Sequence, residues 1–291
     1  MQSEKDQTVT LSDGRKLGFA CYGPQSETVV FHFHGSAGSR LERPAEDAVL
    51  QDPGIRLISV DRPGHGLSDL QPNRKLSDWP NDVKQLAAHL GVKSFYVMGL
   101  SAGGPHALAC AHELKDQVLA CAIVGCPASP DRPNPYQGLS ISHRAITFIF
   151  RNIPWLTCQM RRGMYKLANG DEETLRAKLI SGFPPADRKL LEVPNNLALM
   201  LEEIKEGYRR GWQGPASDDI AIFSRWHFRP QDISTRVDIW HGGLDRNIPL
   251  DQARYNHEKI PNSHLTVWPE LGHLGILAKW REVLNALITE S

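Results

Sequence analysis

Cysteine is scarce in this chain, and its pattern argues against cross-linking. The 291 residues include five cysteines, an odd number with no pair in CxxC spacing. Disulfide frameworks and structural zinc sites are built from paired cysteines, so this pattern favours neither. We expect the cysteines to be reduced and mostly packed in the interior, as in a cytoplasmic protein.

Long apolar runs are also absent. Runs such as residues 118–124 fall far short of the roughly 18 residues that a membrane span requires. Residues 1–10 read MQSEKDQTVT and lack the apolar stretch and cleavage site of a secretory signal. We therefore expect no membrane span and a cytoplasmic location.

Neither sign of charge predominates. Lys plus Arg and Asp plus Glu both total 33, which gives a formal net charge of zero. A chain without net positive charge has no overall field to attract nucleic acid or an anionic membrane. Apolar residues make up 41% and charged residues 23%, close to the averages of globular domains. We expect a globular protein that does not bind nucleic acid.

What the sequence does contain is an alternation of strand and helix patterns over residues 1–125, which is typical of an α/β fold with a mostly parallel sheet. Residues 8–11 and 16–22 flank the turn Ser12-Asp13-Gly14 and predict a hairpin at the sheet edge. An amphipathic helix is expected within 76–90. Buried strands are expected at 28–34, 56–60, 94–99 and 118–125.

The pattern changes over residues 128–232, which carry helical periodicity, many prolines and no convincing strand. The α/β alternation then resumes, with strands expected at 237–240 and 265–268 and helices at 250–259 and 274–288. We therefore predict one α/β domain formed by residues 1–127 and 233–291, into which residues 128–232 are inserted. We call residues 128–232 the insert.

The most informative motif is Gly99-Leu100-Ser101-Ala102-Gly103, which lies between an expected strand and an expected helix. This GxSxG pattern in a strand–turn–helix context predicts a nucleophile elbow, a sharp turn that exposes the serine hydroxyl. A side chain at Gly99 or Gly103 would collide with neighbouring backbone in so sharp a turn. Ser101 is thus the predicted nucleophile.

A serine hydroxyl needs an imidazole to accept its proton and a carboxylate to orient that imidazole. His273 follows the last expected strand, and Asp245 follows the strand before it. Both therefore lie at the carboxyl edge of the sheet, where open α/β sheets place their sites. The order Ser101, Asp245, His273 is that of the elbow-containing hydrolases, so we predict His273 as base and Asp245 as its partner.

Acyl transfer also needs two hydrogen-bond donors for the negative oxygen that develops on the substrate. The backbone N–H of Ala102 is the first predicted donor. The second is the N–H of Ser36, in the glycine-containing loop His34–Arg40 after the strand at 28–34. This loop lacks the spacing of the phosphate-binding GxxxxGK[ST] motif, so we do not expect it to bind phosphate.

With these residues in place, the chain resembles the α/β-hydrolase superfamily over nearly its whole length. Residues Asp61-Arg62-Pro63-Gly64-His65-Gly66-Leu67-Ser68 are similar to a turn that follows the fourth strand in members with a cap. The resemblance implies a mostly parallel eight-stranded sheet flanked by helices, with the insert as a helical cap. It also implies a serine esterase. Relatives that cleave alkyl halides or epoxides have an aspartate at the elbow, where this chain has Ser101.

The cap of such enzymes closes over the acyl pocket, so its aromatic side chains are candidate pocket residues. The insert offers Phe148, Phe150, Trp155, Trp212, Phe223, Trp226 and Phe228. We predict substrate contacts from Phe148, Trp155 and Trp226, and from Gly35 of the loop. The pair Arg161-Arg162 is expected to be solvated.

The predicted function is hydrolysis of carboxylic esters of small to medium, apolar substrates. Three alternatives stay open: the same residues could cleave a lactone or a carbon–carbon bond, could transfer an acyl group, or could belong to a ligand-binding receptor on this scaffold. No motif implies a metal ion or an organic cofactor. The sequence does not predict the oligomeric state.

Overall fold

The computed structural model describes residues 4–193 and 195–289. Its centre is an eight-stranded sheet in the order β1-β2-β4-β3-β5-β6-β7-β8. β2 runs antiparallel to both of its neighbours, and all other neighbouring strands are parallel. The strands are β1 Glu4–Thr10, β2 Lys16–Tyr22, β3 Val29–Phe33, β4 Arg56–Val60, β5 Phe95–Leu100, β6 Val118–Val124, β7 Val237–Gly242 and β8 Ser263–Trp268.

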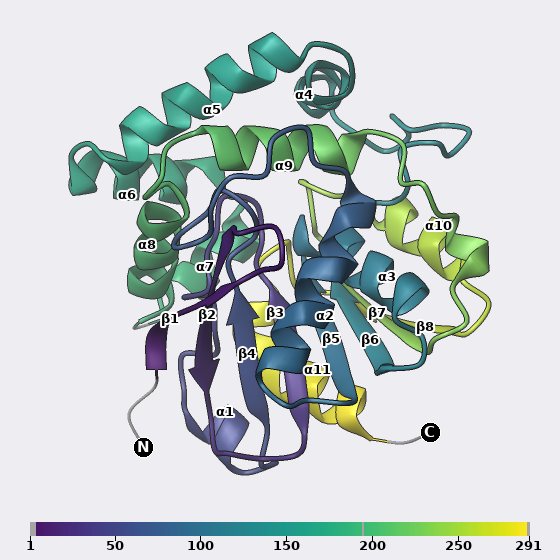
Figure 1. Ribbon diagram of the computed structural model, residues 1–291. Helices are drawn as coiled ribbons and strands as arrows, with labels where there is room; N and C mark the ends of the chain where they lie inside the picture. The colour runs from purple at the N-terminus through teal and green to yellow at the C-terminus, as the bar shows by residue number, and fades with distance from the viewer. Residues whose placement is uncertain (1–3, 194, 290–291) are drawn as a thin grey trace.

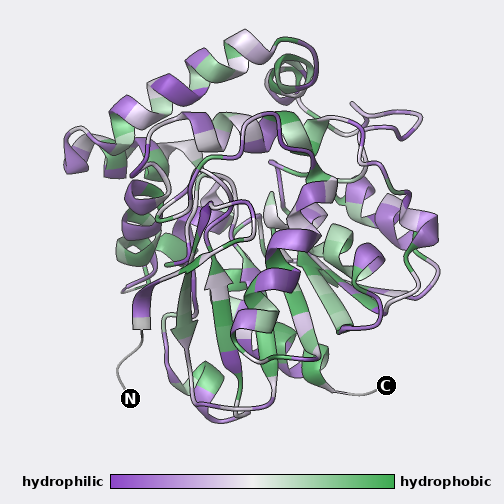
Figure 2. Cartoon of the chain, viewed as in Figure 1, coloured by the Kyte–Doolittle hydropathy of each residue, from purple (hydrophilic) through white to green (hydrophobic). Residues whose placement is uncertain are grey.

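Helices cover both faces of the sheet (Figure 1). One apolar cluster packs side chains of α2, α3 and α10 against one face, and a second packs α1 and α11 against the other. Because both faces are covered, the central strands are mostly apolar, and they are largely green in Figure 2. These helices are α1 Ala48–Gln51, α2 Trp79–His89, α3 Gly103–Glu113, α10 Leu250–Lys259 and α11 Ile276–Ile288, and a 3₁₀ turn, η1 Leu76–Asp78, precedes α2.

The insert lies between β6 and β7 and, in its described residues, contains helices and no strand, as predicted. Its helices gather at one end of the sheet, above the strands in Figure 1. They are α4 Ile141–Asn152, α5 Pro154–Ala168, α6 Glu172–Gly182, α7 Pro185–Leu191, α8 Asn196–Gly207 and α9 Gln213–Phe223, followed by the 3₁₀ turn η2 Pro230–Asp232.

The predicted fold is confirmed, and most boundaries move by only a few residues. The edge hairpin forms as expected, although β1 begins earlier, at Glu4. The closing helix was expected from residue 274 but begins at Ile276, after a turn over residues 273–275. Among the described residues, no helix is both long enough and apolar enough to cross a membrane.

Candidate active site

Ser101 lies at the sharp turn between β5 and α3, with φ of 49°, in the left-handed region that non-glycine residues rarely adopt. Its N–H donates to the Val124 carbonyl at 2.8 Å, which ties the turn to β6. The steric need for both glycines is confirmed. A Cβ at Gly99 would lie 2.3 Å from the Gly103 oxygen, and one at Gly103 would lie 2.0 Å from the Phe33 oxygen.

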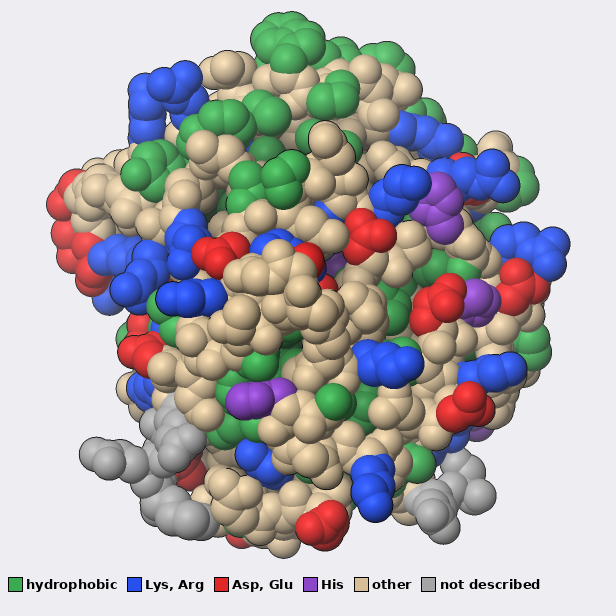
Figure 3. All heavy atoms as spheres, viewed as in Figure 1, with side chains coloured by type: hydrophobic (Ala, Val, Ile, Leu, Met, Phe, Trp, Pro, Cys, Tyr) green, Lys and Arg blue, Asp and Glu red, His purple; other side chains and the backbone are tan. Residues whose placement is uncertain are grey.

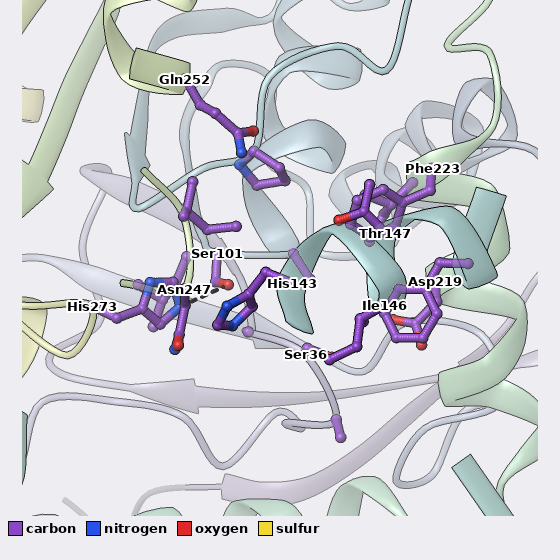
Figure 4. Close-up of a pocket in the computed structure, with 18 of the residues that line it drawn as sticks. Ser36, Ser101, His143, Ile146, Thr147, Asp219, Phe223, Asn247, Gln252 and His273 are labelled. Carbon is purple, nitrogen blue, oxygen red and sulfur yellow. Dashed lines mark hydrogen bonds between the residues drawn. The ribbon is translucent and has the colours of Figure 1, made fainter. Parts of the chain in front are cut away.

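The structure brings Ser101, His273 and Asp245 together. Figure 4 shows Ser101 and His273 side by side at the cavity. The Ser101 hydroxyl lies 3.0 Å from His273 Nε2, and His273 Nδ1 lies 2.7 Å from Asp245 Oδ2. Since a carboxylate only accepts, Nδ1 carries the proton and Nε2 is free to accept from the hydroxyl. Asp245 Oδ1 accepts from the N–H groups of Asn247 and Ile248 at 2.8 and 2.9 Å, which fixes the carboxylate.

These groups also change each other's pKa. Burial alone would lower the pKa of His273, but the charge and hydrogen bond of Asp245, together with the charges of Asp187 and Glu42, raise it above its usual value. Burial would raise the pKa of Asp245, yet the charge and hydrogen bond of His273 bring it below its usual value. An imidazolium is therefore stabilised at this position.

Asp187 of α7 is a further residue at this place; it is buried, and nothing in its local sequence pointed to it. Its Oδ1 accepts from the Leu274 N–H at 2.8 Å, and its carboxyl group packs against Gly272. Its Oδ2 is buried without a hydrogen-bond partner among the described residues. The insert thus holds the backbone on both sides of His273.

The loop that carries Gly35 and Ser36 is held by buried polar groups on its far side. The Gly35 carbonyl accepts from Arg62 Nη2 at 3.0 Å and from His34 Nδ1 at 2.8 Å, while the Gly35 N–H donates to Glu42 Oε2 at 2.9 Å. In a trans peptide the N–H points opposite to the carbonyl, so the Ser36 N–H points away from Arg62.

The Ala102 N–H is oriented in the same way. The Ser101 carbonyl accepts from the Gly104 N–H at 3.0 Å, so the Ala102 N–H points in the opposite direction. Among the described residues, neither the Ser36 N–H nor the Ala102 N–H has an acceptor within the protein. Both residues line the same cavity as Ser101.

Two consecutive aspartates of α9 anchor this loop region. Asp218, which is buried, pairs with Arg62 at 2.7 Å and also with Arg74. Asp219 pairs with Arg161 of α5 at 2.7 Å, and Arg161 Nη2 donates to the Ser36 hydroxyl at 2.6 Å. The expectation that Arg161 is solvated was therefore wrong, because a buried carboxylate from a neighbouring helix neutralises it.

A cavity of about 450 Å³ lies between the sheet edge and the insert. Ser101, His273, Gly35, Ser36 and Ala102 line it on the sheet side. In Figure 4, residues of α4 and α9 approach from the side opposite His273. Much of its wall is apolar, from Leu139, Ile146, Phe150, Met164, Leu179, Phe183, Met200, Ile204, Ile222 and Phe223. Among the described residues, no group of three or more His, Cys, Asp or Glu side chains could hold a metal ion.

Three predicted substrate contacts do not line this cavity. Phe148 and Trp155 point outward and are 49% and 68% exposed. Trp226 is buried in the core beside Phe228, where its indole N–H donates to the Ile222 carbonyl. Of the aromatic candidates in the insert, Phe150 and Phe223 are the ones that line the cavity.

Comparisons with known proteins identify the family and the fold. A family model described as alpha/beta hydrolase fold matches residues 28–279. A bifunctional esterase/perhydrolase from Acinetobacter calcoaceticus is 30% identical over 95% of this chain and 96% of its own length. A non-heme chloroperoxidase from Streptomyces lividans is 25% identical over 96% of each chain. The crystal structure of the enol-lactonase from Burkholderia xenovorans has a TM-score of 0.72 at 16% identity, covering 98% of this chain and 100% of that one, which is a similarity of fold.

Proposed function

Because the chain belongs to the alpha/beta hydrolase fold family, we propose that it is a serine hydrolase of carboxylic esters. The observation that carries the proposal is the continuous hydrogen-bonded series from Ser101 through His273 to Asp245, open to a mostly apolar cavity. In this proposal the insert is the cap, and residues 1–127 and 233–291 form the core domain.

In the first step, His273 Nε2 accepts the Ser101 proton as the hydroxyl oxygen attacks the ester carbonyl. Asp245 stabilises the imidazolium that results. The raised pKa of His273 supports this role, because the surroundings of the ring favour its protonated form. The imidazolium then protonates the leaving alcohol, and Ser101 is left as an acyl ester.

The negative oxygen of the tetrahedral intermediate is proposed to bind the N–H groups of Ser36 and Ala102. Each such donor contributes about 3 kcal/mol to the stabilisation of the transition state. Their orientation supports the assignment, since the carbonyls of Gly35 and Ser101 are already engaged on the opposite side. In the second step, His273 activates a water that releases the acyl group.

The size and lining of the cavity favour small to medium apolar substrates. A cavity of about 450 Å³ falls within the range of small-molecule sites. Gly35, Phe150 and Phe223 are the proposed substrate contacts on its wall. Phe148, Trp155 and Trp226 have no part in this role.

The test is intact-protein mass spectrometry after treatment with a fluorophosphonate, with hydrolysis of short p-nitrophenyl esters followed in parallel. We expect one adduct on the native protein and none on Ser101→Ala. We also expect Ser101→Ala to lower ester turnover by at least about a thousandfold with little change in melting temperature. A variant that keeps its turnover would exclude Ser101 as the nucleophile.

A second candidate reaction is transfer of the same acyl group to hydrogen peroxide, which releases a peracid instead of a carboxylic acid. The similarity to an esterase/perhydrolase, at 30% identity over nearly the whole chain, favours testing it. The acyl–Ser101 bond breaks in both cases, and only the attacking oxygen differs. Chromatographic detection of peracid from an ester plus peroxide distinguishes the two, and Ser101→Ala is the control.

A further inference from the structure

Charge is unevenly distributed along a chain whose net charge is zero. Between Asp131 and Asp171 there is no acidic residue at all. The same stretch, which includes α4 and α5 of the insert, contains six basic residues: Arg132, Arg144, Arg151, Arg161, Arg162 and Lys166. Arg132 is buried and Arg161 pairs with Asp219, so the exposed charges of this stretch are those of Arg144, Arg162 and Lys166. Exposed positive charge on amphipathic helices is typical of a surface that contacts a membrane.

Helix α4 has an inner face on the cavity and an outer, exposed face. Ile146, Thr147 and Phe150 line the cavity. At about 100° per residue, Ile141 and Phe148 lie on the opposite side of the helix, where they are 88% and 49% exposed. In all, no residue of α4 is fully buried.

Helix α5 continues this outer surface. Trp155 is 68% exposed, and Arg162 and Lys166, which are exposed, follow it at helical spacing on the same side. Arg144 of α4 is exposed too and lies one turn from Ile141 and Phe148. Figure 3 shows hydrophobic side chains gathered at the top of the molecule, over α4 and α5, with Lys and Arg beside them.

We infer that this outer surface of α4 and α5 binds a lipid surface of net negative charge. The six residues that define it are Ile141, Arg144, Phe148, Trp155, Arg162 and Lys166, which we call the basic–apolar face. Apolar side chains flanked by Lys and Arg, with an aromatic residue among them, are what a helix lying in a membrane interface presents. From the zero net charge we expected no attraction to an anionic membrane. The net charge does not show that positive charges gather on this one surface.

The charge pattern argues against a second copy of this chain as the occupant. In a twofold interface the same surface meets itself, so the exposed arginines and lysine would face like charges. An anionic lipid surface instead neutralises them and takes up the apolar side chains.

The binding itself does not depend on catalysis. It places the cavity close to a phase in which apolar esters dissolve, since the inner face of α4 lines that cavity.

The experiment is flotation of the purified protein with two kinds of vesicle, one of phosphatidylcholine alone and one of phosphatidylcholine mixed equally with phosphatidylglycerol. We expect flotation with the mixed vesicles only, and release as salt is added. Replacing Arg144, Arg162 and Lys166 by Gln should weaken binding by about fivefold for each side chain removed. The double variant Phe148→Ser, Trp155→Ser should not float.

Matched controls lie far from this surface. Leu119→Ser removes a hydrophobic side chain that is 53% exposed on β6, and Lys115→Gln removes an exposed charge after α3; both should float like the native protein. Ser101→Ala should float as well, so a failure of the proposed hydrolysis is seen separately. Melting temperatures show that each variant is folded.

Two results would overturn the inference. One is that the native protein does not float with the mixed vesicles at low salt. The other is binding that the basic–apolar face variants leave unchanged. Sedimentation equilibrium completes the test. If the native protein is a dimer that binds no vesicles, and the double variant Phe148→Ser, Trp155→Ser is a monomer, the surface binds a second copy instead.

Discussion

At the scale of single residues, the elbow depends on two glycines that leave no room for a side chain. The backbone passes so close to Gly99 and Gly103 that a methyl group at either would overlap a carbonyl oxygen. Ser101 itself keeps an unfavourable backbone angle, which the surrounding strands and α3 enforce. The position of Ser101 is therefore determined by the packing around it rather than by the backbone preference of a serine.

We expect Gly103→Ala to destabilise the protein by at least about 2 kcal/mol, because the new methyl must displace the backbone of β3. Ester turnover should fall as the elbow shifts. Gly163→Ala is the matched control: a methyl added there, in α5, would have open space for 4 Å around it, and the change should stabilise the helix by up to about 1 kcal/mol. Urea unfolding measures both. Equal stabilities for the two variants would contradict the steric account.

At the scale of secondary-structure elements, short contacts between the insert and the core position the site. Helix α7 reaches the backbone beside His273 through Asp187, and α9 reaches the loop of Ser36 through Asp218 and Asp219. Each contact joins segments far apart in sequence. Displacement of the insert would therefore disturb the imidazole and the loop together.

We expect Asp187→Asn to shift the acid limb of the ester-hydrolysis pH profile to lower pH. The amide oxygen can still accept from the Leu274 N–H, but a negative charge that raises the pKa of His273 is removed. His273 must be neutral to accept the Ser101 proton, so a lower pKa keeps it active at lower pH. Of the other groups near the ring, Asp245 and Glu42 continue to raise its pKa, and His241 lies close to Asp245.

KM should change little in Asp187→Asn, since Asp187 does not line the cavity. Asp251→Asn, on α10, is a control that should leave the profile in place. A profile that does not move in Asp187→Asn, with an unchanged melting temperature, would show that the Asp187 charge does not act on His273.

The sequence predicted where the strands and helices lie better than it predicted which face of each helix points inward. Alternating patterns located the strands, and the elbow motif with its chain order brought Ser101, Asp245 and His273 to one edge of the sheet. Periodicity could not say which side of α4 faces inward, because both sides carry aromatics: Phe150 lines the cavity and Phe148, two residues earlier, points out. Asp187 and Arg161 have long-range partners, which no local pattern contains.

At the scale of the whole molecule, buried charge joins the core to the insert. Arg62 and Arg74 share Asp218, and burial lowers the pKa of each guanidinium to about 9. Three buried histidines, His34, His65 and His106, surround them. Burial, reinforced by the charge of Arg62, holds the pKa of each imidazole well below its usual value.

We expect this cluster to make the stability of the fold sensitive to acid. Below about pH 6.5 the unfolded chain takes up protons that the three buried imidazoles cannot, so stability falls as pH decreases, by up to about 1.4 kcal/mol per pH unit for each histidine. Urea unfolding at pH 7.5 and pH 5.5 checks this. His106→Gln should make the loss shallower, whereas His264→Gln, at an exposed position, should not. A stability independent of pH in this range would contradict the prediction.

The position of the insert has a consequence for synthesis of the chain. β6 ends at Val124, but its sheet neighbour β7 begins only at Val237. A ribosome needs roughly 6 to 20 seconds to add the residues between them. During that time the apolar strand β6 has an unpaired edge, which is a template for association with other nascent chains. Fragments that stop before β7 should therefore aggregate, whereas the full chain should not.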